Sequence, residues 1–154
     1  MTSLSAAVNS ASAESLWVVR DKVSFLSTLP APGFALLEVT VPPGSGTPPH
    51  RHASPEIFHV VAGEITVGSF EGPVPQFTRL VAGDNVSVAS NVAHNYQNNG
   101  GETARMLVVA EDTMVAFFRE LGVGEPPPAA PPSEAEIGRI RTACQRHGIE
   151  MLAP

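Results

Sequence analysis

Several features that would place the chain in other protein classes are scarce. Cys144 is the only cysteine, so no disulfide can form within the chain, and nothing indicates an oxidising compartment. No apolar run approaches the roughly eighteen residues that a transmembrane helix needs. The first residues are rich in serine and alanine but lack the basic start and long apolar centre of a secretion signal. These absences predict a soluble, cytoplasmic protein.

Basic residues are also few. The chain has 9 lysines and arginines against 15 aspartates and glutamates, which gives a formal net charge of −6. This balance disfavours binding to nucleic acid or to an anionic membrane surface, because both would be repelled. We therefore expect neither partner.

Proline and glycine are abundant, with 15 and 13 copies in 154 residues, and they fall between short apolar runs. The length suits one domain. Short runs with alternating or continuous apolar residues, separated by turn residues about every ten positions, predict an all-β barrel or sandwich. The expected strands are residues 16–20, 23–27, 34–41, 57–62, 65–70, 76–81, 86–89, 94–98 and 103–111.

Helical signals appear only near the C-terminus. Met114, Phe117, Phe118 and Leu121 have helical spacing, and Asp112 or Thr113 is the expected N-cap. Ser133 and Glu136 form a capping-box pattern for a second helix that ends near His147, with Ile137, Ile140 and Cys144 as its buried stripe. The predicted organisation is a flexible tail at 1–14, a barrel at 15–112 and a helical extension at 113–154 with a proline-rich linker at 125–132.

The chemistry concentrates in the segment from Gly44 to Gly63. His50 and His52 are two residues apart, so they share one face of a β-strand, and Glu56 follows four residues later. Two imidazoles and a carboxylate favour a first-row transition metal over calcium or a structural zinc clip. His94, in a later glycine-punctuated segment, is a candidate for the fourth ligand.

These residues resemble the two motifs of the cupin superfamily. Gly44, His50, His52, Glu56 and Gly63 match the first motif at every spacing. Gly83, His94 and Asn98 match the second motif at the same spacing. Ala89 and Asn91 stand where that motif prefers proline and glycine, which affects a turn and no ligand. Asn91 can still adopt the left-handed conformation that glycine would take.

The resemblance implies a double-stranded β-helix (jelly-roll) barrel in which His50, His52, Glu56 and His94 hold one divalent metal. Fe(II) is the expected metal, with Mn, Ni, Co, Cu or Zn as alternatives. Within the superfamily the chain looks like the small quercetin 2,3-dioxygenase-like proteins. Strand alternation places Phe58 beside Glu56, and Tyr96 and Asn98 beside His94, as candidate substrate-binding residues.

The leading functional hypothesis is a metal-dependent dioxygenase that acts with O2 on a small oxygenated organic substrate, with Glu56 also accepting a proton. A non-redox isomerase, cyclase or lyase and a non-catalytic metal or small-ligand binding protein remain open. The resemblance also implies a homodimer, with residues 16–27 or the face of Ile57 and Val61 as contact surfaces.

Overall fold

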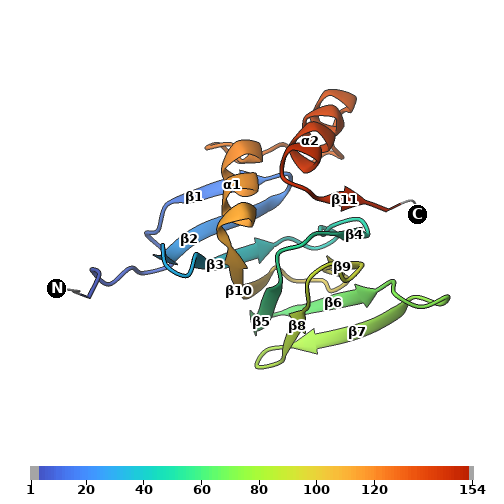
Figure 1. Ribbon diagram of the computed structural model, residues 1–154, viewed down its shortest axis with the longest axis horizontal. Helices are drawn as coiled ribbons and strands as arrows, with labels where there is room; N and C mark the ends of the chain where they lie inside the picture. The colour runs from blue at the N-terminus through green and yellow to red at the C-terminus, as the bar shows by residue number, and fades with distance from the viewer. Residues whose placement is uncertain (1–3, 153–154) are drawn as a thin grey trace.

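Two antiparallel β-sheets build the molecule; helix α1 packs against the six-stranded sheet, and α2 lies next to α1 and β11 (Figure 1). The computed structural model describes residues 4–152. The six-stranded sheet has the order β1 (Ser15–Val18), β2 (Asp21–Leu29), β3 (Phe34–Val41), β10 (Ala104–Glu111), β5 (Glu56–Ala62) and β8 (Asn85–Val88). The five-stranded sheet has the order β11 (Glu150–Met151), β4 (His50–Arg51), β9 (His94–Gln97), β6 (Glu64–Ser69) and β7 (Gln76–Val81).

The core lies between the sheets because apolar residues alternate along the central strands. In β3 the side chains of Ala35, Leu37, Val39 and Val41 are buried and their neighbours are not. The antiparallel partner β10 buries alternate residues in the same way, and the two strands pair along their whole length. Buried residues of β6 and β9 pack against this layer from the other sheet. The prediction of an all-β domain followed by two helices is confirmed.

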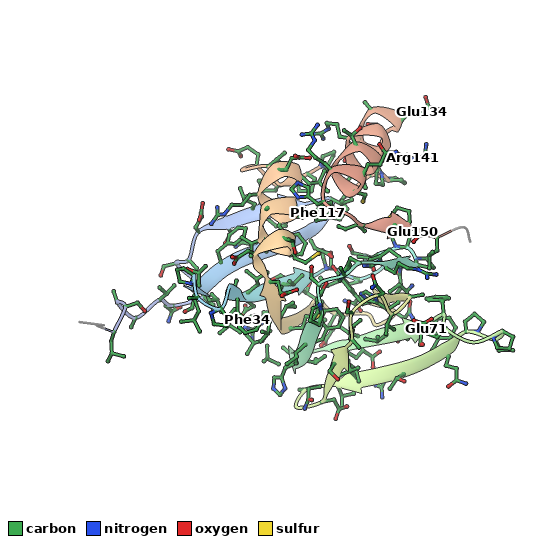
Figure 2. The ribbon with its side chains drawn as sticks, viewed as in Figure 1. Phe34, Glu71, Phe117, Glu134, Arg141 and Glu150 are labelled. Atoms are coloured by element: carbon green, nitrogen blue, oxygen red, sulfur yellow. The ribbon has the colours of Figure 1, made fainter. Side chains whose placement is uncertain are left out.

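Helix α1 (Asp112–Leu121) follows β10 without a loop and buries Met114, Phe117 and Leu121 (Figure 2). Its N-cap is Glu111, which forms no side-chain capping bond. The predicted N-cap at Asp112 or Thr113 is therefore wrong. The Thr113 hydroxyl instead shares a 2.7 Å hydrogen bond with the Ser54 hydroxyl, in the loop that follows His52.

Helix α2 (Glu134–Arg146) begins as the capping pattern predicts, since the Ser133 hydroxyl accepts a hydrogen bond from the Glu136 amide. The Glu136 carboxylate also pairs with Arg20 at 3.1 Å. Ala143 and Cys144 are buried, whereas Ile137 is 39% exposed, so the predicted buried stripe is shifted. In residues 4–152, neither helix has the length and apolar character to cross a membrane.

The strand that was expected to carry both His50 and His52 ends at Arg51, and the very short β11 was not predicted. β4 contains only His50 and Arg51, and β11 pairs with it from the C-terminal end of the chain. Their pairing places the C-terminal segment beside the first histidine of the motif (Figure 1).

Candidate metal centre

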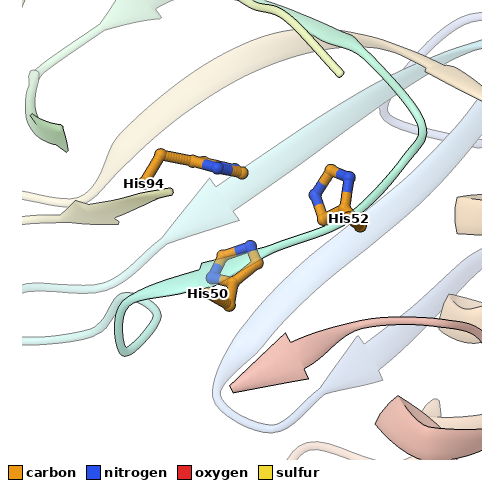
Figure 3. A group of neighbouring side chains, drawn as sticks. All are labelled: His50, His52 and His94. Carbon is orange, nitrogen blue, oxygen red and sulfur yellow. The ribbon is translucent and has the colours of Figure 1, made fainter. Parts of the chain in front are cut away.

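Three histidines from two parts of the chain meet between the sheets (Figure 3). His50 lies in β4, His52 follows that strand, and His94 is the first residue of β9. His50 and His94 are direct cross-strand partners. One ring nitrogen from each histidine lies within 4.8 Å of the other two, and the side chains are almost fully buried, with 9%, 4% and 3% of their surface exposed.

The backbone fixes the tautomer of all three rings. Each Nδ1 lies within hydrogen-bond distance of a backbone carbonyl two residues away. The acceptors for His50, His52 and His94 are Pro48, Ser54 and Val92, at 2.8, 2.7 and 2.8 Å. Because a carbonyl only accepts, each Nδ1 carries a proton, and in the neutral ring the lone pair then lies on Nε2. This is the arrangement by which outer partners orient metal-binding histidines.

Glu56, the first residue of β5, brings a buried carboxylate to this group from the six-stranded sheet. Its Oε1 lies 2.9 Å from His52 Nε2, yet that nitrogen has no hydrogen bond of acceptable geometry. Two ligand atoms on one ion, each bonded at about 2.0–2.2 Å, are separated by about 3 Å. The three histidines and the unpaired buried nitrogen therefore fit a divalent metal ion, whereas Glu56 stands outside the group whose ligand atoms all lie within 4.8 Å of one another.

Burial controls the charge of the histidines. It lowers the pKa of His50 to about 4 and also lowers the pKa of His94, so both imidazoles are neutral near pH 7. Burial lowers the pKa of His52 as well, but the neighbouring Glu56 carboxylate outweighs this effect and the net shift is upward. Neutral imidazoles are the form that binds a metal.

Of the three predicted substrate contacts, Phe58 lies beside His94, and Tyr96 lies beside Phe58. The Phe58 ring centroid lies 6.3 Å from that of His94 and 6.0 Å from that of Tyr96. Asn98 has a different environment: its amide donates to the Val41 and Glu102 carbonyls and accepts from the Gly100 amide. These bonds engage both polar atoms of Asn98 and give its side chain a structural role in the turn that follows β9.

Sequence reasoning missed a buried acid near this site. The Asp21 carboxylate, 5% exposed, accepts hydrogen bonds from the Ser45 hydroxyl at 2.6 Å and from the Tyr96 hydroxyl. Burial raises the pKa of Asp21 although both bonds oppose the shift. Burial raises the pKa of Tyr96 too, and the charges of Asp21 and Glu56 add to this. Asp21 precedes a lysine at a strand boundary, and no local pattern marks it as inward-facing.

The turns of the two motifs have the conformations that their residues predict. Gly44, Gly63 and Gly83 have φ values of 82°, 72° and 96°. Asn91, at a position where the resembled motif prefers glycine, has φ of 63°. The prediction that asparagine adopts the left-handed conformation there is confirmed.

Comparisons with known proteins agree with this geometry. A family model described as a cupin domain matches residues 37–110. Auxin-binding protein 1 of Arabidopsis thaliana is 33% identical over 85 residues, which is 51% of this chain and 42% of that protein. The chain therefore spans less than half the length of this relative.

Solved structures share the fold at low sequence identity. The polyketide cyclase RemF from Streptomyces resistomycificus superposes with a TM-score of 0.61 at 21% identity, over 71% of this chain and 80% of that one. A predicted oxalate decarboxylase from Thermotoga maritima superposes with a TM-score of 0.59 at 21% sequence identity, over 69% of this chain and 98% of that one. An RmlC-like cupin from Shewanella frigidimarina superposes with a TM-score of 0.60 at 17% sequence identity, over 73% of this chain and 95% of that one.

These structures confirm the expected double-stranded β-helix. Together with the matching family model and the three-histidine group, they show that the chain is a small protein of the cupin superfamily.

Proposed function

We propose that the protein is a metal-dependent dioxygenase of the quercetin 2,3-dioxygenase-like kind, acting on a small oxygenated organic molecule. The observation that supports this most directly is the set of three buried imidazoles with their Nε2 lone pairs free. Three neutral imidazoles and one carboxylate leave open coordination positions on a transition metal, and Fe(II) suits this set.

In this proposal His50, His52 and His94 hold the metal through Nε2, and Glu56 completes the set. When bound, the metal supplies a Lewis acid with open positions and, if it is iron, redox chemistry with O2. The Glu56 carboxylate accepts the proton of the substrate hydroxyl as the substrate binds. Its burial keeps water from competing for that proton, and its position 2.9 Å from His52 keeps it at the edge of the metal site.

The neighbouring side chains define the kind of substrate in this proposal. Phe58 provides an apolar surface beside His94. Tyr96 adds a hydroxyl whose orientation is set by Asp21. A planar molecule with a hydroxyl or enediol oxygen fits such a surface, because it offers an apolar face and polar oxygens at its rim.

A second candidate is non-redox chemistry, as in an isomerase, cyclase or lyase. The hydrogen-bonded Asp21 and Tyr96 favour it, because they form a second pair that can hold or release a proton close to the metal site. Relatives of similar fold include a polyketide cyclase and a predicted oxalate decarboxylase. A third candidate is small-ligand binding without catalysis, which the similarity to an auxin-binding protein favours.

Oxygen uptake separates these candidates. Protein loaded with Fe(II) is mixed with a panel of flavonols and enediols, and O2 consumption and substrate loss are recorded together. The proposal expects substrate-dependent uptake that is lost in Glu56→Gln and kept in Glu102→Gln, an exposed carboxylate outside the site. Turnover of a substrate under nitrogen, without uptake, would favour the non-redox candidate. Tight binding of a substrate with no turnover would favour the binding protein.

We also propose that the protein is a homodimer. Ile57, on the outer face of β5, is 45% exposed, and Val61 lies on the same strand. Sedimentation at micromolar concentration measures the mass directly. The proposal expects twice the chain mass for the native protein and a shift to the monomer in Ile57→Glu. A native monomer at all concentrations would contradict it.

A further inference from the structure

The C-terminal segment Gly148–Leu152, here called the strap, forms the outer edge of the five-stranded sheet beside β4 (Figure 1). Within it, Met151 pairs with His50 and Glu150 pairs with Arg51. The amide of Leu152 donates to the Pro49 carbonyl at 3.0 Å. On its other side, β4 pairs with β9 through His50 and His94 alone. The strap therefore supplies much of the backbone pairing that holds His50.

The strap is itself anchored to α2. Gly148, with φ of 69°, reverses the chain after the helix. The Ile149 amide then donates to the Cys144 carbonyl at 2.9 Å, and the Ile149 side chain is buried. Helix α2 is tied in turn to the β1–β2 connection by the Glu136–Arg20 ion pair. The position of β4 is thus linked to the docking of the helical extension.

Backbone pairing, and not charge, accounts for this link. The ion pair between Arg51 and Glu150 is long, at 3.7 Å, and both side chains are well exposed. Exposed pairs of this kind contribute little. The Leu152 bond holds Pro49, which lies between His50 and Pro48, whose carbonyl fixes the His50 ring.

We propose that the strap is a positioning element for the metal ligand His50, so that strap docking and metal binding strengthen each other. The inference rests on the metal centre of the proposed function. A ligand that keeps its position before the metal arrives binds without an ordering cost, so an undocked strap weakens metal binding. Thermodynamic linkage makes the effect reciprocal, and a bound metal therefore stabilises the docked strap.

A pair of substitutions at one position tests the inference. Leu152→Pro removes the amide that bonds to Pro49, whereas Leu152→Ala shortens the side chain and keeps the amide. Co²⁺ is the probe, with affinity measured by chelator competition and ligand geometry by visible absorption. We expect Leu152→Pro to weaken Co²⁺ binding on the order of tenfold and to alter the spectrum. Leu152→Ala and Glu150→Gln should stay within about twofold of the native protein.

Equal Co²⁺ affinity and equal spectra in the proline and alanine variants would overturn the inference while leaving the metal centre intact. Failure of the native protein to bind Co²⁺ would overturn both the inference and the proposed function.

Hydrogen exchange in the native protein gives a second test that needs no strap variant. With Co²⁺ added, the amides of the strap should exchange more slowly, and by a larger factor than those of β7, at the opposite edge of the same sheet. The effect should vanish in His94→Ala. Equal slowing in the strap and β7 would mean that the metal stabilises the whole fold, which would contradict a specific link.

Discussion

At the scale of single residues, the orientation of each side chain in the site is set by its protein contacts. The match of His50, His52 and His94 to the cupin motifs predicted that they meet. The carbonyls that fix the histidine tautomers are each only two residues away in the chain. The sequence does not show whether the backbone bends so that such a carbonyl faces the histidine ring. Asp21 was missed because its partners Ser45 and Tyr96 lie 24 and 75 residues away in the chain.

Glu56 is the residue whose role is tested most simply. Glu56→Gln keeps the size of the side chain and removes the negative charge beside His52. We expect metal affinity to fall by at least the roughly 10–100-fold that is typical of mutating an outer partner, with little change in fold. Chelator competition measures the affinity, and circular dichroism checks the fold. Unchanged affinity would mean that the carboxylate takes no part in holding the metal.

Asp21 gives a prediction about stability and pH. The pKa of Asp21 is raised in the folded state, so its ionised form lowers the free energy of unfolding at pH values above that pKa. This penalty disappears as the pH falls toward about 4, the ordinary pKa of an aspartate in the unfolded chain. Asp21→Asn has no such penalty and keeps partners for both hydroxyls. In metal-free protein we expect the variant to match or exceed the native stability near pH 7, with its relative advantage shrinking on acidification.

Denaturant unfolding from pH 4 to 8 measures this difference. Asp21→Ala is the comparison, since it leaves the Ser45 and Tyr96 hydroxyls without their acceptor. It should lose about 1–3 kcal/mol of unfolding free energy. A gap between the asparagine variant and the native protein that widens at low pH would contradict the assignment.

At the scale of secondary-structure elements, the long strands were predictable because their apolar periodicity reports burial directly. β3 and β7 have the predicted bounds, and the other long strands differ by one or a few residues. The short extent of β4 and the presence of β11 were not predictable, since two-residue strands carry no periodicity and form only when distant segments pair.

Two motif glycines differ in a way that tests the turn between β5 and β6. Gly63 and Gly44 both have positive φ, but a Cβ at Gly63 would lie 2.9 Å from the Ala104 Cα, and one at Gly44 meets nothing within 4 Å. We expect Gly44→Ala to cost about 1–2 kcal/mol for its backbone conformation. Gly63→Ala should cost roughly 1–3 kcal/mol more because of the clash. Equal losses in thermal or denaturant unfolding would show that the crowding is relieved easily.

At the scale of the whole molecule, the proposed centre joins the two sheets. His50 and His94 come from the five-stranded sheet, and Glu56 comes from the six-stranded sheet. The fold and this convergence followed from the motif spacing and its resemblance to cupins. The surroundings of the site followed only in part: Phe58 and Tyr96 were named from the sequence, whereas Asp21 reaches Tyr96 only after folding.

A metal that bridges both sheets stabilises the fold by mass action. At a free metal concentration 100 times the dissociation constant, the gain is about 2.7 kcal/mol. For a domain of this size it raises the melting temperature on the order of 5–10 °C. Calorimetry with and without metal measures the shift, which His59→Ala, outside the centre, should retain. No shift at saturating metal would contradict a site shared between the sheets.

The central claim is that one metal ion binds each chain through the three histidines. Calorimetric titration of chelator-treated protein with Co²⁺ tests it most directly. The native protein and His59→Ala should bind one ion per chain, and His94→Ala should lose more than the roughly 10–100-fold in affinity that is typical of mutating an outer partner. Weak binding of several ions with equal affinity in the native protein and His94→Ala would contradict the claim.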